Sequence, residues 1–279
     1  MGSFSIATYS QNGKPARWRV LSAPVDGVSE SDLIDLILVN AESESGLAIT
    51  YLTAWTLVQV ERDPDFQELL QGFDIVYADG IGVVLALWLT TFRRIRKVTA
   101  NDFFFELCVQ AARRNLSVAF VGTQEGITDE VARIAREQIP GLEIKLTAKG
   151  YLTPPEESSV LQHLEREKPH IVLLGRGQPL QEEWVQQCRS LLPTTVFFCV
   201  GGLFDYVSGR VRHTPRWIRR CGFEWLHRLT FNFQTYWRIY VFGLPILFGY
   251  IARHNIRRLF PGFGLFRSDS CSDEGRARS

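Results

Sequence analysis

Apolar runs of strand length alternate with amphipathic stretches of helix length between residues 31 and 200. The strands that this pattern predicts are Leu47–Leu52, Asp74–Ala78, Val118–Gly122, Glu143–Leu146, Ile171–Gly175 and Thr195–Val200. The predicted helices are Ser31–Asn40, Trp55–Arg62, Ile81–Thr90, Asp102–Arg114, Ile127–Gln138, Pro155–Glu167 and Gln181–Leu191. Alternation of this kind predicts an α/β fold, with a mostly parallel sheet and helices on both of its faces.

Folds of this class bind ligands outside the carboxyl ends of their strands. Glycine is common at these positions in the present chain, in the segments Ala78-Asp79-Gly80, Gly122-Thr123, Gly175-Arg176-Gly177-Gln178-Pro179 and Gly201-Gly202. A glycine turn lets backbone N–H groups come close to an anion. We therefore expect a site for a phosphorylated ligand at this edge of the sheet.

Asp79 follows one predicted strand and precedes Gly80 and a predicted helix. A carboxylate in this place is within reach of a substrate and can accept a proton from an attacking hydroxyl group. The alternative is an ordinary helix N-cap, a position that aspartate often occupies. The sequence leaves both interpretations open.

The segment from Gly175 to Trp184 reads GRGQPLQEEW. Its two glycines favour a turn that can hold a diphosphate on backbone N–H groups, and Gln178 and Gln181 add side-chain amides. The alternative is a plain loop between strand and helix, in which Glu182 and Glu183 interact with the helix dipole.

Several other chemistries find little support in the sequence. The segment FVGTQEGITDE, from Phe120 to Glu130, lacks the G-x-G-x-x-G dinucleotide fingerprint, and we interpret Thr123 as a helix cap. The five histidines are scattered, and the five cysteines show neither CxxC nor metal-ligand spacing. We therefore expect no NAD, no metal held by the protein and, from the odd number of cysteines, a reducing compartment.

The character of the chain changes near residue 212. From Gly209 onward it holds thirteen arginines, no lysine and four acidic residues, although the whole chain has a formal net charge of only +1. Trp217 and Trp225 interrupt these arginines. The pattern allows three interpretations: contact of Arg228 and Arg238 with a substrate diphosphate, docking on anionic lipid, or a solvated face.

These observations divide the chain into four parts. We expect a disordered N-terminus (1–16), a core (17–212), an Arg- and Trp-rich appendage (213–266) and a disordered tail (267–279). The first twenty residues have no long apolar stretch typical of a secretory signal. The segment Ile239–Ile251 is apolar but short, and we expect it to lie in a membrane interface or on the core.

Six motifs in order resemble the WecG/TagA/CpsF glycosyltransferase family, over residues 20 to 250. They are ADGIGVV, KVTANDF, FVGTQEG, KGYL, LLGRGQPLQEEW and VGGLFDYVSGRVRHTPRWIRRCGFEWLHRL. The resemblance implies a Rossmann-like fold of the GT-E type with a helical C-terminal appendage that docks on the membrane. It also implies metal-independent, inverting transfer from a UDP-sugar to a polyprenyl-diphosphate-linked sugar, at the inner face of a bacterial plasma membrane.

The resemblance also assigns residues. It places the catalytic base at Asp79, the motif residues for substrate at Gln181, Glu182 and Tyr151, and diphosphate-binding arginines at Arg228 and Arg238. The further donor or substrate contacts that we expect are Tyr51, Thr53, Gly80, Lys97, Asn101, Asp102, Gly122, Gly175, Gln178, Gly201, Gly202 and Asp205. The further lipid or membrane contacts are Arg210, Arg212 and Arg216.

Three segments depart from the family pattern: Tyr51-Leu52-Thr53, Lys97-Val98-Thr99-Ala100 and Asn232-Phe233-Gln234-Thr235. They allow a donor other than UDP-N-acetylmannosamine, such as another UDP-hexose, or a relative that binds a UDP-sugar without turnover. An oxidoreductase and a nucleic-acid-binding protein are weaker alternatives, and we expect no nucleic-acid partner. The sequence leaves the oligomeric state open, a homo-oligomer included.

Overall fold

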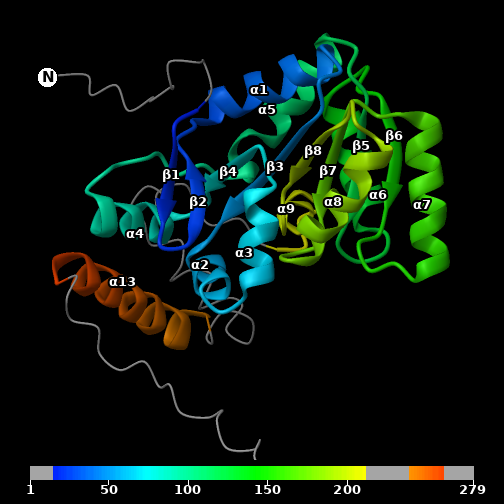
Figure 1. The fold of residues 1–279 in the computed structure, drawn as a ribbon. Helices are drawn as coiled ribbons and strands as arrows, with labels where there is room; N and C mark the ends of the chain where they lie inside the picture. Colours follow the sequence, from blue (N-terminus) through cyan, green and yellow to red (C-terminus); the bar gives the residue numbers. More distant parts are fainter. Residues whose placement is uncertain (1–14, 212–238, 261–279) are drawn as a thin grey trace, which may run out of the picture.

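The structure, a computed structural model, describes residues 15–211 and 239–260. In this part of the chain one sheet has the strand order β1-β2-β4-β3-β8-β7-β5-β6 (Figure 1). Only the pair β1–β2 is antiparallel, so the predicted α/β fold with a mostly parallel sheet is confirmed. The strands are β1 Arg17–Val20, β2 Ala23–Asp26, β3 Leu47–Leu52, β4 Ile75–Ala78, β5 Val118–Gly122, β6 Ile144–Ala148, β7 Ile171–Gly175 and β8 Val196–Cys199.

Helices cover both faces of the sheet (Figure 1). One core cluster joins the sheet to α1 Glu30–Glu42, α5 Ala100–Arg113, α6 Ile127–Gln138 and α9 Leu203–Val207. The other cluster joins it to α2 Ala54–Val60, α3 Pro64–Gln71, α4 Ile81–Thr91, α7 Pro154–Glu167, α8 Leu180–Leu191 and α13 Leu244–Leu259. Both faces of each central strand are therefore buried, which explains the continuous apolar runs in the sequence.

The sequence pattern predicts most of these elements closely. The ranges expected for β3, β5, β7 and α6 match the structure residue for residue, and the others differ at their ends. Capping accounts for several starts: Ser29 and Thr53 form capping boxes at α1 and α2, and Asp63 caps α3 ahead of Pro64. Helix ends fray, so differences of one or two residues there carry no further meaning.

Three short elements were not predicted. The β1–β2 hairpin turns through Leu21, which has a φ of 56°, and its sequence has none of the Asn-Gly or Asp-Gly pairs that mark such turns. The short helix α9 follows Gly202 directly. Helix α3 did have a recognisable signal, because Asp63 and Pro64 are a typical helix start.

Helix α13 contains most of the apolar segment that we expected in an interface or on the core. Pro245 lies in its first turn, where a missing N–H is tolerated. Leu247 and Ile251 are buried, and the helix packs against α2 and α4 (Figure 1). A π-helical turn, η1 Ile239–Gly243, precedes it. None of the helices in the described ranges is both long and apolar enough to cross a bilayer.

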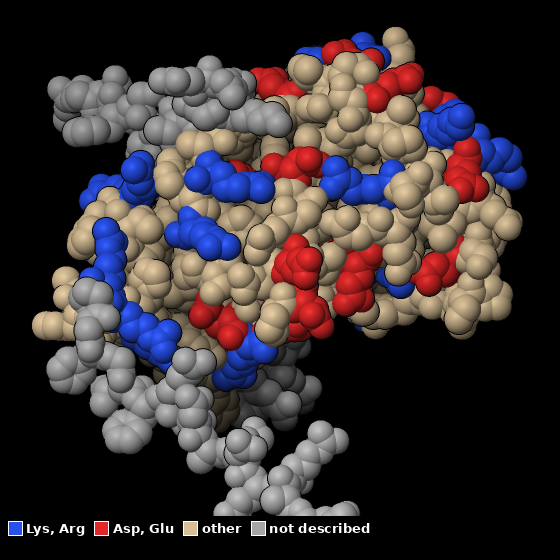
Figure 2. Space-filling model, in the orientation of Figure 1, with Lys and Arg blue, Asp and Glu red and all other residues tan. Residues whose placement is uncertain are grey.

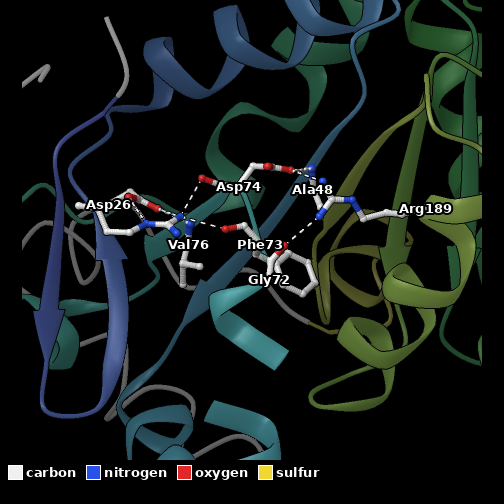
Figure 3. A network of polar contacts seen from close by, with 8 residues as sticks. Asp26, Ala48, Gly72, Phe73, Asp74, Val76 and Arg189 are labelled. Atoms are coloured by element: carbon white, nitrogen blue, oxygen red, sulfur yellow. Dashed lines mark hydrogen bonds and ion pairs between the residues drawn. The ribbon is translucent and has the colours of Figure 1, made fainter. Parts of the chain in front are cut away.

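At the amino ends of β3 and β4, two arginines enclose the segment that enters β4 (Figure 3). Arg17 forms a two-point ion pair with buried Asp26, at 2.9 and 2.8 Å, and also donates to the carbonyl oxygens of Phe73 and Asp74. Arg189 donates to the Asp74 carboxylate at 2.7 Å. Backbone N–H groups complete the network, since Val76 donates to Asp26 and Ala48 to Asp74. We call these residues the amino-edge network.

The strand order also creates a switch point. The chain leaves β4 on one side of β3, and its next strand, β5, lies beyond β8 and β7 on the other side. The loops that follow β3 and β4 therefore diverge from those that follow β8 and β7, and the crevice between such loops is where ligands bind in folds of this class.

Candidate active site

The carboxyl ends of five neighbouring strands carry the predicted site residues. Register pairs Leu52 with Ala78, and Gly122 with Gly175, so the loops that follow them begin side by side. We call this region the carboxyl edge. The predicted residues on or directly after these strands are Tyr51, Thr53, Asp79, Gly80, Gly122, Gly175, Gln178, Gly201 and Gly202.

Asp79 lies immediately after β4. Its backbone N–H donates to the carbonyl oxygen of Leu52 at 2.8 Å, and its Oδ1 accepts a hydrogen bond from Thr99 Oγ1 at 3.1 Å. Gly80, with a φ of 104°, is the N-cap of α4, so the N-cap interpretation of Asp79 is wrong. The carboxylate is partly exposed and is held by a hydroxyl group, an arrangement that leaves it able to accept a proton.

A second cluster joins the start of α8 to β3. The buried Glu182 carboxylate accepts three hydrogen bonds at Oε1, from Thr50 at 2.5 Å, Gln181 at 2.8 Å and Gln178 at 3.0 Å. Gln178 also donates to the carbonyl oxygen of Tyr51 and accepts from Thr56. Glu182 and Glu183 both lie in the first turn of α8, as their interpretation as helix-dipole partners expects, but the Glu182 side chain is fully enclosed and also holds this cluster together.

Burial changes the proton affinity of two groups in this cluster. It raises the pKa of Glu182 to about 7, although the three hydrogen bonds oppose the rise. It also raises the pKa of the Tyr51 hydroxyl well above its usual value, and the nearby charges of Glu182 and Asp79 act in the same direction. Tyr51 therefore stays protonated at neutral pH and can donate a hydrogen bond.

Three glycines bring the strand ends close together. A Cβ atom at Gly122 would lie 2.5 Å from the carbonyl oxygen of Gly175, and one at Gly175 would lie 2.5 Å from that of Gly201. A Cβ atom at Gly201 would lie 2.2 Å from the Tyr51 hydroxyl oxygen. These positions exclude any side chain, so the backbone itself forms this part of the carboxyl edge.

A third cluster lies beyond β5. Thr123 donates to Asp205 at 2.9 Å, and Arg210 donates to Gln124 at 2.5 Å. Our interpretation of Thr123 as a helix cap is wrong, since Gly126 is the N-cap of α6. Backbone contacts between Thr123 and Gly150 place Tyr151, which is exposed, next to this cluster.

The remaining predicted residues divide into two groups. Lys97, Asn101 and Asp102 lie close to Asp79 in the chain fold, because Val98 N–H donates to the carbonyl oxygen of Ala78 at 2.9 Å. The other four lie outside the described residues, and they are Arg212, Arg216, Arg228 and Arg238. In residues 15–211 and 239–260, no three His, Cys, Asp or Glu side chains group as metal ligands would.

Sequence reasoning missed four threonines that hold the candidate site together: Thr50, Thr56, Thr99 and Thr123. For two of them a signal existed. Thr50 is a polar residue inside the apolar strand LAITYL, and a buried hydroxyl needs a partner. Thr53 and Thr56 have the spacing of a capping box, which predicts the local bond but not the contact with Gln178.

Comparison with known proteins agrees with this architecture. The sequence profile described as "Glycosyl transferase WecG/TagA/CpsF family" matches residues 18–260, so the chain belongs to this family of glycosyltransferases. The match spans the whole sheet and includes α13.

Two curated relatives carry the name N-acetylglucosaminyldiphosphoundecaprenol N-acetyl-beta-D-mannosaminyltransferase. The protein from Bacillus subtilis (strain 168) is 29% identical over 171 residues, which are 61% of this chain and 66% of the relative. The protein from Bacillus spizizenii is 29% identical over 177 residues, 63% of this chain and 68% of the relative. The chain thus spans about two thirds of each relative.

Proposed function

We propose that this protein transfers a hexose or N-acetylhexosamine from a UDP-sugar to a polyprenyl-diphosphate-linked sugar, with inversion, in bacterial cell-envelope or exopolysaccharide synthesis. Family membership and the names of the two relatives support the reaction class. The observation that carries the proposal is the position of Asp79, at the end of β4 and beside Thr99. The proposed donor sugar is N-acetylmannosamine-like, as the relatives' names suggest, or glucose, which the departures from the family pattern at Tyr51 and Ala100 allow.

In the proposed reaction, Asp79 accepts the proton of the acceptor hydroxyl as its oxygen attacks the anomeric carbon of the donor. The bond from that carbon to the UDP oxygen breaks on the opposite face, which inverts the configuration. Positioned proton transfer of this kind contributes about 10²- to 10⁴-fold to a rate.

The departing UDP carries negative charge that the protein must stabilise. Backbone N–H groups at the bare glycine turns around Gly175 and Gly201 are the candidate donors at the same edge, since the amides of Gln178 and Gln181 already donate to Glu182. We propose that these groups, with cationic side chains of the C-terminal segment, hold the diphosphate without a metal ion. Arg228 and Arg238 are the candidates for the acceptor diphosphate, and Arg210, Arg212 and Arg216 for an anionic membrane at the cytoplasmic face.

The test is UDP release from a panel of UDP-sugars, with and without a short-chain polyprenyl-diphosphate-linked GlcNAc or glucose. Release from one donor that depends on acceptor would support the proposal and identify the sugar. Asp79→Asn should lower turnover by about 10²- to 10⁴-fold while leaving UDP affinity intact. Asp35→Asn, a change on the exposed face of α1, is the matched control.

Other outcomes would contradict parts of the proposal. Normal turnover by Asp79→Asn would remove that residue from the role of base. UDP binding without release from any donor, over the full acceptor panel, would favour a non-catalytic UDP-sugar-binding relative. Absence of UDP binding would exclude the donor class altogether.

A further inference from the structure

Helix α4 has an apolar stripe that faces solvent. Ile81, Leu85, Trp88 and Phe92 are all exposed, with Phe92 the most exposed at 78%. The spacing of four and three residues puts Ile81, Leu85 and Trp88 on one side of the helix, along about 10 Å of its length, and Phe92 follows at its C-cap. The opposite side of α4 is buried in the core through Val83, Ala86, Leu87 and Thr90.

Helix α13 shows the same division and lies against α4. Leu247 and Ile251 are buried, whereas Phe248, Ile256 and Leu259 are exposed and apolar. The two helices meet near their carboxyl ends, since Asn255 donates to the carbonyl oxygen of Leu89 at 3.0 Å and Arg258 to that of Thr90 at 2.9 Å. Two adjacent helices therefore both expose large apolar side chains. Contiguous exposed apolar patches often mark a surface that binds a partner or a membrane.

Within the two chain segments that carry these stripes, all charged side chains have one sign. Residues 80–101 and 239–260 contain no aspartate or glutamate. The exposed arginines of the two segments are Arg93, Arg94, Arg96, Arg253, Arg257 and Arg258. Basic side chains also predominate on the side of the molecule where α4 and α13 lie, at the left of Figure 2, while acidic ones gather toward its middle and right. Exposed apolar residues on two segments whose own charged side chains are all basic match the chemistry of an anionic bilayer surface.

We propose that α4 and α13 together form a face that docks on an anionic phospholipid bilayer, with the apolar stripes in the interface and the arginines at the head groups. The stripe of α4 begins at Ile81, two residues after Asp79, so docking would bring the proposed base to the membrane surface. This inference rests on the proposed function in one respect, because a lipid-linked acceptor would be presented at that surface. The new element is α4, which belongs to the core, whereas α13 belongs to the C-terminal appendage.

The experiment is co-sedimentation of the full chain with vesicles of phosphatidylglycerol or of phosphatidylcholine. Wild type should bind the first and not the second. Leu85→Gln combined with Phe92→Gln should weaken binding at least about tenfold, because large apolar side chains no longer enter the interface. Val39→Gln with Leu191→Gln, which changes exposed apolar residues on α1 and α8, is the matched control and should bind normally.

Charge is tested separately, with the tail arginines present in every variant. Arg94→Glu with Arg257→Glu should weaken binding to phosphatidylglycerol by a similar factor, and Arg113→Glu with Arg166→Glu, elsewhere on the surface, should not. UDP affinity should stay unchanged in all variants, which verifies folding. Transfer to an acceptor embedded in vesicles should fall in the docking variants, while transfer to a short-chain soluble acceptor should not.

Unchanged vesicle binding by both docking variants would overturn the inference. So would a wild-type dimer that the Leu85/Phe92 variant loses without any change in lipid affinity, since the face would then pair two copies. Vesicle binding requires neither donor nor acceptor. Lipid binding that follows the predicted pattern without any transfer would therefore support the docking face and contradict the proposed function.

Discussion

The two ends of the sheet hold their carboxylates in different ways. At the amino-edge network, Asp26 and Asp74 each accept hydrogen bonds from an arginine and from a backbone N–H group (Figure 3). At the carboxyl edge, the hydrogen bonds described above reach Asp79, Glu182 and Asp205 from threonine hydroxyls and glutamine amides.

The difference separates stability from chemistry. An arginine fork holds a carboxylate in one geometry, which suits a network that attaches the β1–β2 hairpin to the parallel sheet. At the carboxyl edge, the Thr99 hydroxyl group donates to Asp79 and so fixes the orientation of a carboxylate that can accept a proton. We therefore expect changes at the amino edge to alter unfolding and changes at the carboxyl edge to alter turnover, with one exception.

Glu182 is that exception and carries the largest expected effect on stability. Its folded-state pKa of about 7 lies above the unfolded value near 4.5. Between these values the unfolded chain releases a proton that the folded protein retains, so stability falls as pH rises from about 4.5 to about 7. The loss, on the order of 3 kcal/mol, then persists at higher pH.

Glu182→Gln should remove this pH dependence. Denaturant unfolding at pH 5, 6, 7 and 8 measures the free energy of unfolding of both proteins. The value for Glu182→Gln should increase relative to the wild-type value as the pH rises from 5 to about 7. Glu183→Gln, at the exposed neighbouring position, should follow the wild-type curve. A parallel pH dependence in wild type and Glu182→Gln would show that Glu182 is ionised in both states and would contradict the assigned shift.

Arg17→Met tests the amino-edge network. It leaves the buried Asp26 carboxylate without its two-point partner, and we expect the free energy of unfolding to fall by about 2 kcal/mol. The value is set below that of a fully buried pair because the Arg17 side chain is 37% exposed. Arg19→Met, on the same strand, should have little effect, and UDP affinity should be unchanged in both. If Arg17→Met lost as much free energy of UDP binding as free energy of unfolding, the assignment of stability to the amino edge and of chemistry to the carboxyl edge would be contradicted.

Thr99→Val should have the smallest effect and should act on turnover. It removes the hydroxyl that donates to Asp79 but keeps the side-chain volume in a buried position. We expect kcat to fall about five- to tenfold, which corresponds to about 1 kcal/mol, the value of one ordinary hydrogen bond, with little change in KM for the donor. Thr99→Ser should restore most of the rate. An unchanged rate in Thr99→Val would mean that other contacts orient Asp79.

The sequence predicted the central parallel strands from their apolar runs. β3, β5 and β7 stand out because a parallel strand under two layers of helices needs an unbroken apolar run. The β1–β2 hairpin has no such signal, because its strands are four residues long and its turn passes through Leu21. The glycines at the strand ends likewise identified the edge that holds the candidate site.

What the sequence determined by itself was therefore local: strand and helix periods, the glycine turns, the position of Asp79 between a strand and a helix, and the motifs of the family. Only the tertiary structure decided which side chains meet. Thr50 and Glu182 are 132 positions apart in the chain. Thr56 and Gln178 are 122 apart, and neither contact has a local signature. Such contacts arise because parallel strands from distant segments align their carboxyl ends, and packing then decides which hydroxyl faces which carboxylate.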